Sequence, residues 1–375
     1  MTGALSATRA RLLISLTVEA GDPRLVEWLD RCDPTELWRA IERGRPDVPR
    51  PWVERSAETR RRVDETLARA ERAGAHWVVP GTPGWPVGVE DLDHLPGIGD
   101  VAGAPVGLWV RGGGDPTTIL AAPVGVVGAR GCTTYGAECA SDIAADCADR
   151  GHAVISGAAF GIDACAHRGA LVAGGPTVAV TACGVDVDYP RAHAALLRRI
   201  AEEGLVISEY APGAEPQRHR FLVRNRLIAA ISAGVVVVEA AARSGSLNTL
   251  HWADQLGRTT MVVPGPVTSQ ASVGTHRAVR EGRAHLVTCG AEVLADTFGI
   301  TIEDQGELAR VSAAARRVWV QLDATPKPLE QIAARLRLGT VPVHRALREL
   351  HGWGVAVDDG EGWARRDTAS RGAGQ

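Results

Sequence analysis

The chain has 375 residues, of which 45% are hydrophobic and 23% charged, and its formal net charge is −3. This length predicts two or three domains with a sizeable core, and no apolar run reaches the 18 residues that a membrane span needs. The N-terminus lacks the charged start and apolar core of a signal peptide, so we expect a cytoplasmic protein. Seven scattered cysteines without a CxxC pair predict reduced thiols, with neither a disulfide framework nor a zinc site.

Arginine supplies almost all of the positive charge, because Lys327 is the only lysine among 41 basic residues. Codon composition is enough to explain this bias. Arginine is also the better cation for bidentate phosphate contacts and for stacking on bases, so the bias is compatible with a nucleic-acid partner without demonstrating one.

Residues 1–100 predict an N-terminal helical domain, because apolar residues recur at helical spacing. This domain resembles the sterile-alpha-motif and helix-hairpin-helix domains. Residues 95–99 (Leu-Pro-Gly-Ile-Gly) resemble the hairpin of helix-hairpin-helix DNA binders, although a plain loop is the simpler interpretation. A Gly/Pro-rich run over 96–116, interrupted by a short strand at 107–110, predicts a junction.

From residue 123 to about residue 298, short apolar β-branched segments alternate with helical stretches. The six candidate strands are 124–127, 153–156, 177–181, 205–208, 234–239 and 260–263. This alternation predicts an α/β fold, in which a parallel sheet carries helices on both faces. Ligands of such sheets gather beyond the carboxyl ends of the strands.

The first strand leads into a glycine turn and a helix that we expect over 135–149. A helix start presents free N–H groups and a partial positive charge, which suit a phosphate. Gly128 allows close backbone approach, Arg130 adds donors, and Thr133 or Thr134 can cap the helix. Other strand ends carry similar chemistry: Ser156-Gly157, Ser208-Glu209, Glu239 with Ser244-Gly245-Ser246, and Pro264-Gly265. Their recurrence at one edge predicts an anion or nucleotide site.

Residues 216–226 contain four arginines and no acid, and they open a helix that we expect to run to about residue 231. Arg218, Arg220 and Phe221 lie at the helix start, and Arg224 and Asn225 follow on the same helical face. Cations around an aromatic ring suit a single strand, with phosphates on the arginines and a base stacked on the ring. The alternative is a solvated basic loop with Phe221 in the core.

Together these motifs resemble the DprA/Smf (DNA-processing protein A) family over about residues 105–300. The resemblance rests on Gly128-Ala129-Arg130, Ser156-Gly157, Gly161-Ile162-Asp163, Phe221 with Arg224-Asn225-Arg226, and Ser244-Gly245-Ser246. It implies an extended Rossmann-like parallel sheet over residues 105–300. It also implies a homodimer that binds single-stranded DNA and loads the RecA recombinase during natural transformation, with no catalytic step, cofactor or metal. The DNA- or phosphate-binding residues expected on this basis are Gly128, Ala129, Arg130, Thr133, Ser156, Gly157, Arg218, Arg220, Phe221, Arg224, Asn225, Arg226, Ser244, Gly245 and Ser246.

Three positions depart from the family pattern: Phe160 stands where arginine is common, Leu222 where proline is common, and His276 where asparagine is common. A lost arginine weakens an electrostatic contact, while a second aromatic ring adds a stacking surface.

Two pairs of titratable residues suggest other chemistry. Asp163 and His167 share a helix face, but no nucleophile accompanies them, so we expect structural roles. Glu209 and Glu239 could bind magnesium, but capping or pairing with Arg224 or Arg226 is the preferred interpretation.

Residues 307–367 predict a winged-helix domain, with helices at 308–322, 329–336 and 341–350 and a hairpin from 354 to 365. His344, Arg345 and Arg348 lie on the expected recognition helix. Two other functions stay open. A phosphoribohydrolase-like nucleotide hydrolase would need a Pro-Gly-Gly loop, which Pro264-Gly265-Pro266 breaks, and a duplex-binding regulator would depend on the winged helix alone.

Overall fold

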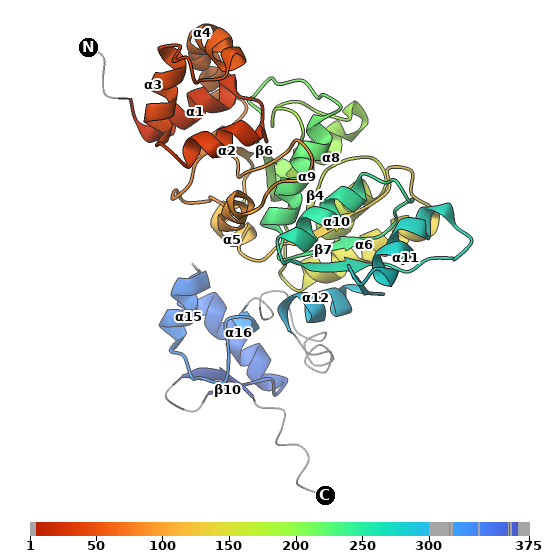
Figure 1. Ribbon diagram of the computed structural model, residues 1–375. Coiled ribbons are helices and arrows are strands. Elements are labelled where there is room, and N and C mark those ends of the chain that lie inside the picture. Colours follow the sequence, from red (N-terminus) through yellow and green to blue (C-terminus); the bar gives the residue numbers. More distant parts are fainter. Residues whose placement is uncertain are drawn as a thin grey trace, which may run out of the picture. The chain divides into compact units, whose positions relative to one another are not determined.

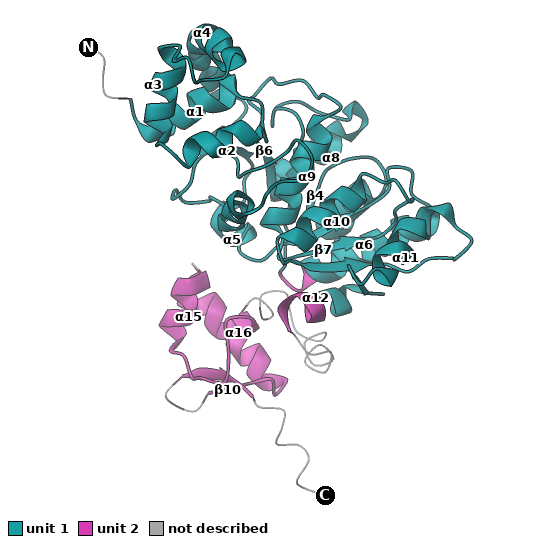
Figure 2. Ribbon diagram, in the orientation of Figure 1, with its two compact units in different colours: residues 1–148, 152–293 teal, residues 149–151, 294–375 magenta. Residues whose placement is uncertain are grey.

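The computed structural model describes residues 5–299, 315, 318–336, 338–358, 360 and 362–366. The chain forms two compact units (Figure 2), one of residues 1–148 and 152–293 and one of residues 149–151 and 294–375. No helix among the described residues is long and apolar enough to cross a bilayer.

The first unit begins with a helical bundle (Figure 1), whose helices are α1 (Ala7–Thr17), α2 (Pro23–Leu29), α3 (Pro34–Glu42) and α4 (Arg50–Arg72). Side-chain oxygens of Ser6, Asp22 and Asp33 accept hydrogen bonds from the first turns of α1, α2 and α3. Trp38 and Trp52 are buried in the bundle. The segment of residues 95–99 forms a loop with a single bridge between Ile98 and Val101.

A nine-stranded sheet follows the bundle, in the order β1-β2-β6-β5-β4-β3-β7-β8-β9. The strands are β1 (Ala75–Val78), β2 (Leu108–Arg111), β3 (Val124–Val127), β4 (Val154–Ser156), β5 (Thr177–Val180), β6 (Leu205–Ser208), β7 (Gly234–Val237), β8 (Thr259–Val262) and β9 (His285–Leu286). β3 to β9 pair in parallel, while β2 is antiparallel to both β1 and β6. The α/β class and the six predicted strands are therefore confirmed, and β1 and β9 are additional.

The direction of winding reverses between β3 and β7, which pair from Val124↔Gly234 to Val127↔Val237. Beyond such a reversal the loops diverge and leave a crevice at the carboxyl edge of the sheet. The loop after β3 and the loop after β7 therefore frame the expected ligand site.

Helices cover both faces of this sheet: α5 (Pro116–Ile119), α6 (Thr134–Asp149), α7 (Ile162–Val172), α8 (Ala194–Glu203), α9 (Arg220–Ile231), α10 (Ser246–Gln255), α11 (Val273–Arg280) and α12 (Gly290–Phe298), with 3₁₀ turns η1 (Val87–His94), η2 (Arg191–His193) and η3 (Gln270–Ser272). Alternate strand residues face opposite cores. Val178 and Val180 pack with α9 and α10, whereas Ala179 packs with α7, α8 and the N-terminal helices. The bundle of residues 7–72 thus shares its core with one face of the sheet.

The second unit contains α15 (Leu329–Leu336), α16 (Thr340–Gly352) and an antiparallel hairpin of β10 (Ala356–Asp358) and β11 (Trp363–Arg365). Leu347, Leu350 and Trp363 belong to its core. These elements match the predicted second and third helices and the hairpin. The predicted first helix, 308–322, falls mostly outside the described residues, so the winged-helix assignment stays a prediction.

One buried ion pair attaches α9 to the end of β6. The Arg226 guanidinium, which is fully buried, donates from Nη1 to Glu209 Oε2 (2.7 Å) and from Nη2 to Glu209 Oε1 (2.9 Å). Its Nε also donates to the Gly103 carbonyl at 3.0 Å. A pair of this kind is costly to break, because the remaining charge stays buried without a partner.

Replacing Arg226 with Met should therefore lower the free energy of unfolding by about 3–5 kcal/mol, measured by urea denaturation followed by circular dichroism. The control is Arg199→Met, because Arg199 forms an exposed pair with Glu203 on α8. The free energy of unfolding of the Arg199→Met variant should fall by less than about 1 kcal/mol. Equal losses in the two variants would contradict the assigned role of the buried pair.

Candidate nucleic-acid interface

Three loops meet backbone to backbone at the carboxyl edge of the sheet. The amide of Ala129 donates to the Glu239 carbonyl (2.8 Å), and the amide of Ile162 donates to the Ala129 carbonyl (3.2 Å). A Cβ on Gly128 would lie 2.6 Å from Ile162 Cγ1, so only glycine permits this approach. The loops after β3, β4 and β7 therefore form one rigid platform.

The start of α6 is occupied by a carboxylate of the protein itself. Glu239 accepts from the Thr133 amide (2.9 Å) and from Thr133 Oγ1 (2.5 Å). Thr133 Oγ1 in turn accepts from the Gly136 amide (3.0 Å), which confirms Thr133 as the cap. Glu239 thus supplies an anion at this helix start, so the phosphate contact expected there has no support in this geometry and stays a prediction.

Arg224 is an internal brace that holds the loop after β4. This guanidinium is 4% exposed and donates from Nη1 to the carbonyls of Gly157 (2.8 Å) and Val180. Asp163 accepts from the amides of Gly157 (3.2 Å) and Ala159 (3.3 Å) in the same loop. Burial raises the pKa of the Asp163 carboxyl and lowers the pKa of the Arg224 guanidinium, and each charge opposes the shift of the other.

His167 lies fully buried beneath this loop, with Nδ1 2.7 Å from Thr177 Oγ1. Because Thr177 Oγ1 donates to the Val154 carbonyl (2.7 Å), it accepts from Nδ1–H of the ring. Burial lowers the pKa of His167 to about 3. A neutral, enclosed imidazole joins α7 to β5 and fits the structural role expected for this residue.

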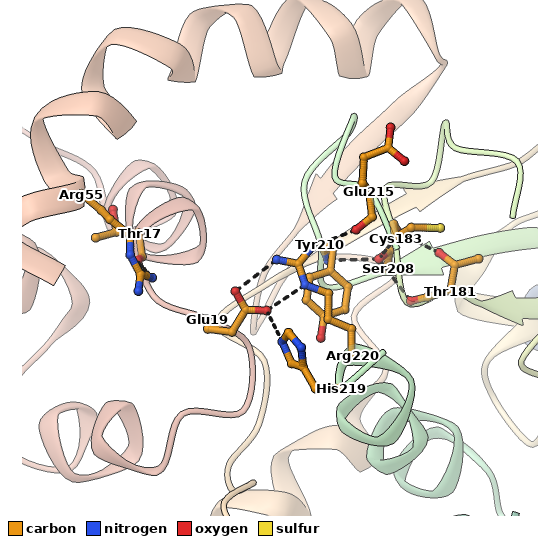
Figure 3. Close-up of polar contacts among 10 residues, drawn as sticks. All are labelled: Thr17, Glu19, Arg55, Thr181, Cys183, Ser208, Tyr210, Glu215, His219 and Arg220. Carbon is orange, nitrogen blue, oxygen red and sulfur yellow. Dashed lines mark hydrogen bonds and ion pairs between the residues drawn. The ribbon is translucent and has the colours of Figure 1, made fainter. Parts of the chain in front are cut away.

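Two of the four arginines in the predicted DNA segment are paired with acids. Arg226 is buried against Glu209, as described above. Arg220 donates from Nε to Glu19 Oε1 (2.8 Å) and from Nη2 to Glu19 Oε2 (3.1 Å), and its guanidinium lies 4.5 Å from the Tyr210 ring centroid (Figure 3). The expected phosphate contacts of Arg220 and Arg226 have no support in this geometry, because neighbouring carboxylates hold both side chains. Sequence alone did not identify Glu19, which lies 201 positions away from Arg220.

The exposed part of the edge is an arginine stacked on an aromatic pair. Arg130 is exposed, and its guanidinium carbon lies 4.9 Å from the centroid of the half-buried Phe221 ring. Tyr189, 40% exposed, contacts the same ring at a centroid distance of 5.6 Å. Arg218 is exposed nearby in sequence, and neither it nor Arg130 forms an ion pair with any residue that the structure describes. The alternative that Phe221 is a core residue in a solvated basic loop therefore holds only in part, because Phe221 is half-buried rather than buried.

Of the remaining predicted residues, some stabilise the fold beneath the edge and others lie at its surface. Ser156 is buried and donates to the Val126 carbonyl (2.7 Å), so it acts within the sheet. Asn225 donates to the Gly245 carbonyl (3.2 Å) and positions the start of α10. Gly245 is exposed there, between Ser244 and Ser246, whose hydroxyls lie 2.7 Å apart.

Sequence reasoning missed Tyr189 as part of this edge. The residue belongs to the loop after β5, the one predicted strand end for which no phosphate-compatible residues had been singled out. An aromatic residue in a loop at that same edge was the available signal.

A separate cleft of about 440 Å³ lies between α4 and residues 209–220. Its arginines are already engaged: Arg62 with Glu58, Arg69 with Asp186, Arg220 with Glu19, and Arg55 with the Thr17 carbonyl. Paired cations give little net attraction for a phosphate backbone, so this cleft is not the expected strand path. Among the described residues, no cluster of His, Cys, Asp and Glu could hold a metal ion.

A model of the family "DNA recombination-mediator protein A" matches residues 79–298. The chain belongs to this family. It is 44% identical over 262 residues to the putative DNA processing protein DprA of Mycobacterium tuberculosis, an alignment that covers 68% of this chain and 66% of that relative. It is 41% identical over 200 residues to DprA of Streptococcus pneumoniae, covering 53% and 69% of the two chains.

Two solved structures have the same fold. The X-ray structure of Streptococcus pneumoniae DprA matches with a TM-score of 0.61 and 31% identity, covering 78% of this chain and 98% of that one. A structure of Helicobacter pylori DprA, described for its single-stranded DNA binding mode, matches with a TM-score of 0.50 and 26% identity, covering 59% and 94%.

The buried imidazole of His167 makes stability depend on pH. The unfolded ring takes up a proton below its ordinary pKa of about 6.5, whereas the folded ring resists protonation down to about 3. Acid therefore favours the unfolded state across this window, and stability is lost as the pH falls. His167→Asn keeps a donor for Thr177 without an ionisable ring, so its urea midpoint should fall less between pH 7 and pH 5 than that of the wild type. Identical pH slopes would contradict the buried neutral ring.

Proposed function

We propose that the chain binds single-stranded DNA along the carboxyl edge of its sheet. The observation that carries this proposal is a cluster at that edge of the exposed Arg130, the half-buried Phe221 and the exposed Tyr189. The exposed Arg218 lies in the segment just before α9. Unpaired guanidinium groups attract phosphates, and exposed rings stack on bases of any sequence. Relatives named for DNA processing, one of them described for single-strand binding, support the same function.

In this proposal Arg130 exchanges partners when DNA binds. Without DNA its guanidinium covers the Phe221 ring by a cation–π contact, which is worth about 0.5–1 kcal/mol at an exposed site. An incoming base takes the ring face, and Arg130 turns to an adjacent phosphate. Base stacking of about 1–3 kcal/mol exceeds the contact that is lost.

The biological role that we propose is recombination mediation. The protein protects incoming single strands and helps to load the RecA recombinase during DNA uptake, acting as a homodimer and without a catalytic step of its own. Family membership supports the recombination role, and the engaged states of Asp163 and His167 support a non-enzymatic protein. Release of ribose 5-phosphate from AMP would instead favour a nucleotide hydrolase.

The first test of this proposal is a salt titration of the full chain with single strands, duplex and mononucleotide. Single strands should bind best, and log K should fall by roughly 0.7 per neutralised phosphate and unit of log salt. Arg130→Ala should weaken binding and reduce that slope, whereas Arg345→Ala, on the exposed surface of α16, should change both less. A flat salt response, a preference for duplex, or equal losses in the two variants would place the function or the strand elsewhere.

Phe221→Leu separates stacking from charge. Leu retains much of the apolar volume but removes the π face, so single-strand affinity should fall by roughly 1–3 kcal/mol while the salt slope stays unchanged. Arg218→Ala should lower both affinity and slope. Thermal melting is the control, and a Phe221→Leu protein that melts early yet binds DNA normally would show that the ring only packs.

A further inference from the structure

We propose that Phe160 is a second base-stacking residue of the single-strand site in this chain. The inference rests on the proposed function and adds a ring on the loop after β4, whose backbone touches the loop that carries Arg130. It concerns the nucleobases rather than the phosphates.

The loop after β4 holds Phe160 at the surface with a firm support beneath it. The side chain is 48% exposed, and its ring meets the His193 ring edge-on at a centroid distance of 4.7 Å and an interplanar angle of 63°. His193 is itself 4% exposed, with Nδ1 3.0 Å from the Ala158 carbonyl. A fixed neighbour restricts the Phe160 ring while about half of the side chain stays open.

Backbone contacts bring Phe160 close to the proposed strand path. The next residue, Gly161, has φ +76°, and a Cβ there would lie 2.5 Å from the Arg130 carbonyl oxygen. The residue next to Phe160 therefore touches the backbone of the loop that carries Arg130, and the Arg130 guanidinium covers the Phe221 ring. A second link runs through the loop after β5, because its Tyr189 contacts Phe221 and its His193 contacts Phe160.

A single exposed Phe is common on protein surfaces and by itself indicates nothing. Here two further exposed side chains, Tyr189 (40% exposed) and Leu222 (50% exposed), lie on the loop after β5 and at the start of α9, which border the same edge. The chain has only three Phe and three Tyr residues, and Phe160, Tyr189 and Phe221 all occupy this edge. Proteins that bind single strands without sequence preference stack successive bases on such rings beside arginines.

Stacking at position 160 does not depend on salt, whereas the arginine that the family resemblance leads us to expect there would make a salt-dependent phosphate contact. Affinity for single strands is then retained with one fewer ionic contact.

The test titrates fluorescently labelled oligothymidylate at several salt concentrations with the full-chain wild type and four variants. Phe160→Leu should lower affinity about 5- to 150-fold at every salt concentration, and Phe160→Tyr should bind as the wild type does. Phe160→Arg should make the salt slope steeper by roughly 0.7. The control, Val172→Ala, trims an 80% exposed apolar side chain at the other end of α7 and should change nothing.

A scan of abasic sites through the same oligonucleotide locates the stacking positions. The wild type should show a sensitive position that disappears in both Phe160→Leu and Phe160→Arg, and the Arg variant serves if the Leu variant folds poorly. Unchanged affinity in Phe160→Leu, together with an unchanged slope in Phe160→Arg, would overturn the inference. Failure of the wild type to bind oligothymidylate would instead overturn the proposed function, so the two failures are distinguishable.

Discussion

The arrangement of the proposed interface depends on the buried guanidinium of Arg224. It joins α9 to the carbonyls of Gly157 and Val180, at the ends of β4 and β5. Phe221 lies three positions earlier on α9, and the loop that Arg224 holds continues to Phe160. Arg224 thus sets the distance between the rings without reaching solvent itself. Gly157 has no side chain because a Cβ there would collide with this guanidinium.

The basic segment before and within α9 shows why residue type alone does not identify a DNA contact. Three of its arginines already have partners: Arg220 binds Glu19, Arg224 binds backbone carbonyls and Arg226 binds Glu209. The arginines that remain available for DNA are Arg218 in this segment and Arg130 in another loop. A buried cation needs a partner, and the protein provides one in each case. Arg218 and Arg130 form no ion pair with any acidic residue that the structure describes.

Local patterns were sufficient to predict the parallel sheet, because short apolar runs such as Val124–Val127 that alternate with helical stretches are typical of buried parallel strands. The cap of α6 was also predictable, because Thr133 was one of the two threonines at the expected helix start. Contacts between residues that are distant in sequence were not predictable from local patterns. Glu239 is 106 positions from Thr133, and β1 pairs antiparallel with β2, which places Trp77 opposite Trp109. Among the site residues, the close backbone approach at Gly128 agrees with expectation, whereas the place of Tyr189 became visible only in the assembled edge.

The most direct test of the strand path is photocrosslinking of an oligonucleotide that carries 5-iododeoxyuridine, followed by mass spectrometric mapping of the attached peptides. Iodouracil reacts on irradiation with aromatic rings stacked against it. The account predicts adducts on the peptides that contain Phe221 and Tyr189, with loss of the Phe221 adduct in the Phe221→Leu protein. Adducts confined to α16 of the second unit, or to the cleft beside α4, would contradict a single-strand site at the carboxyl edge of the sheet.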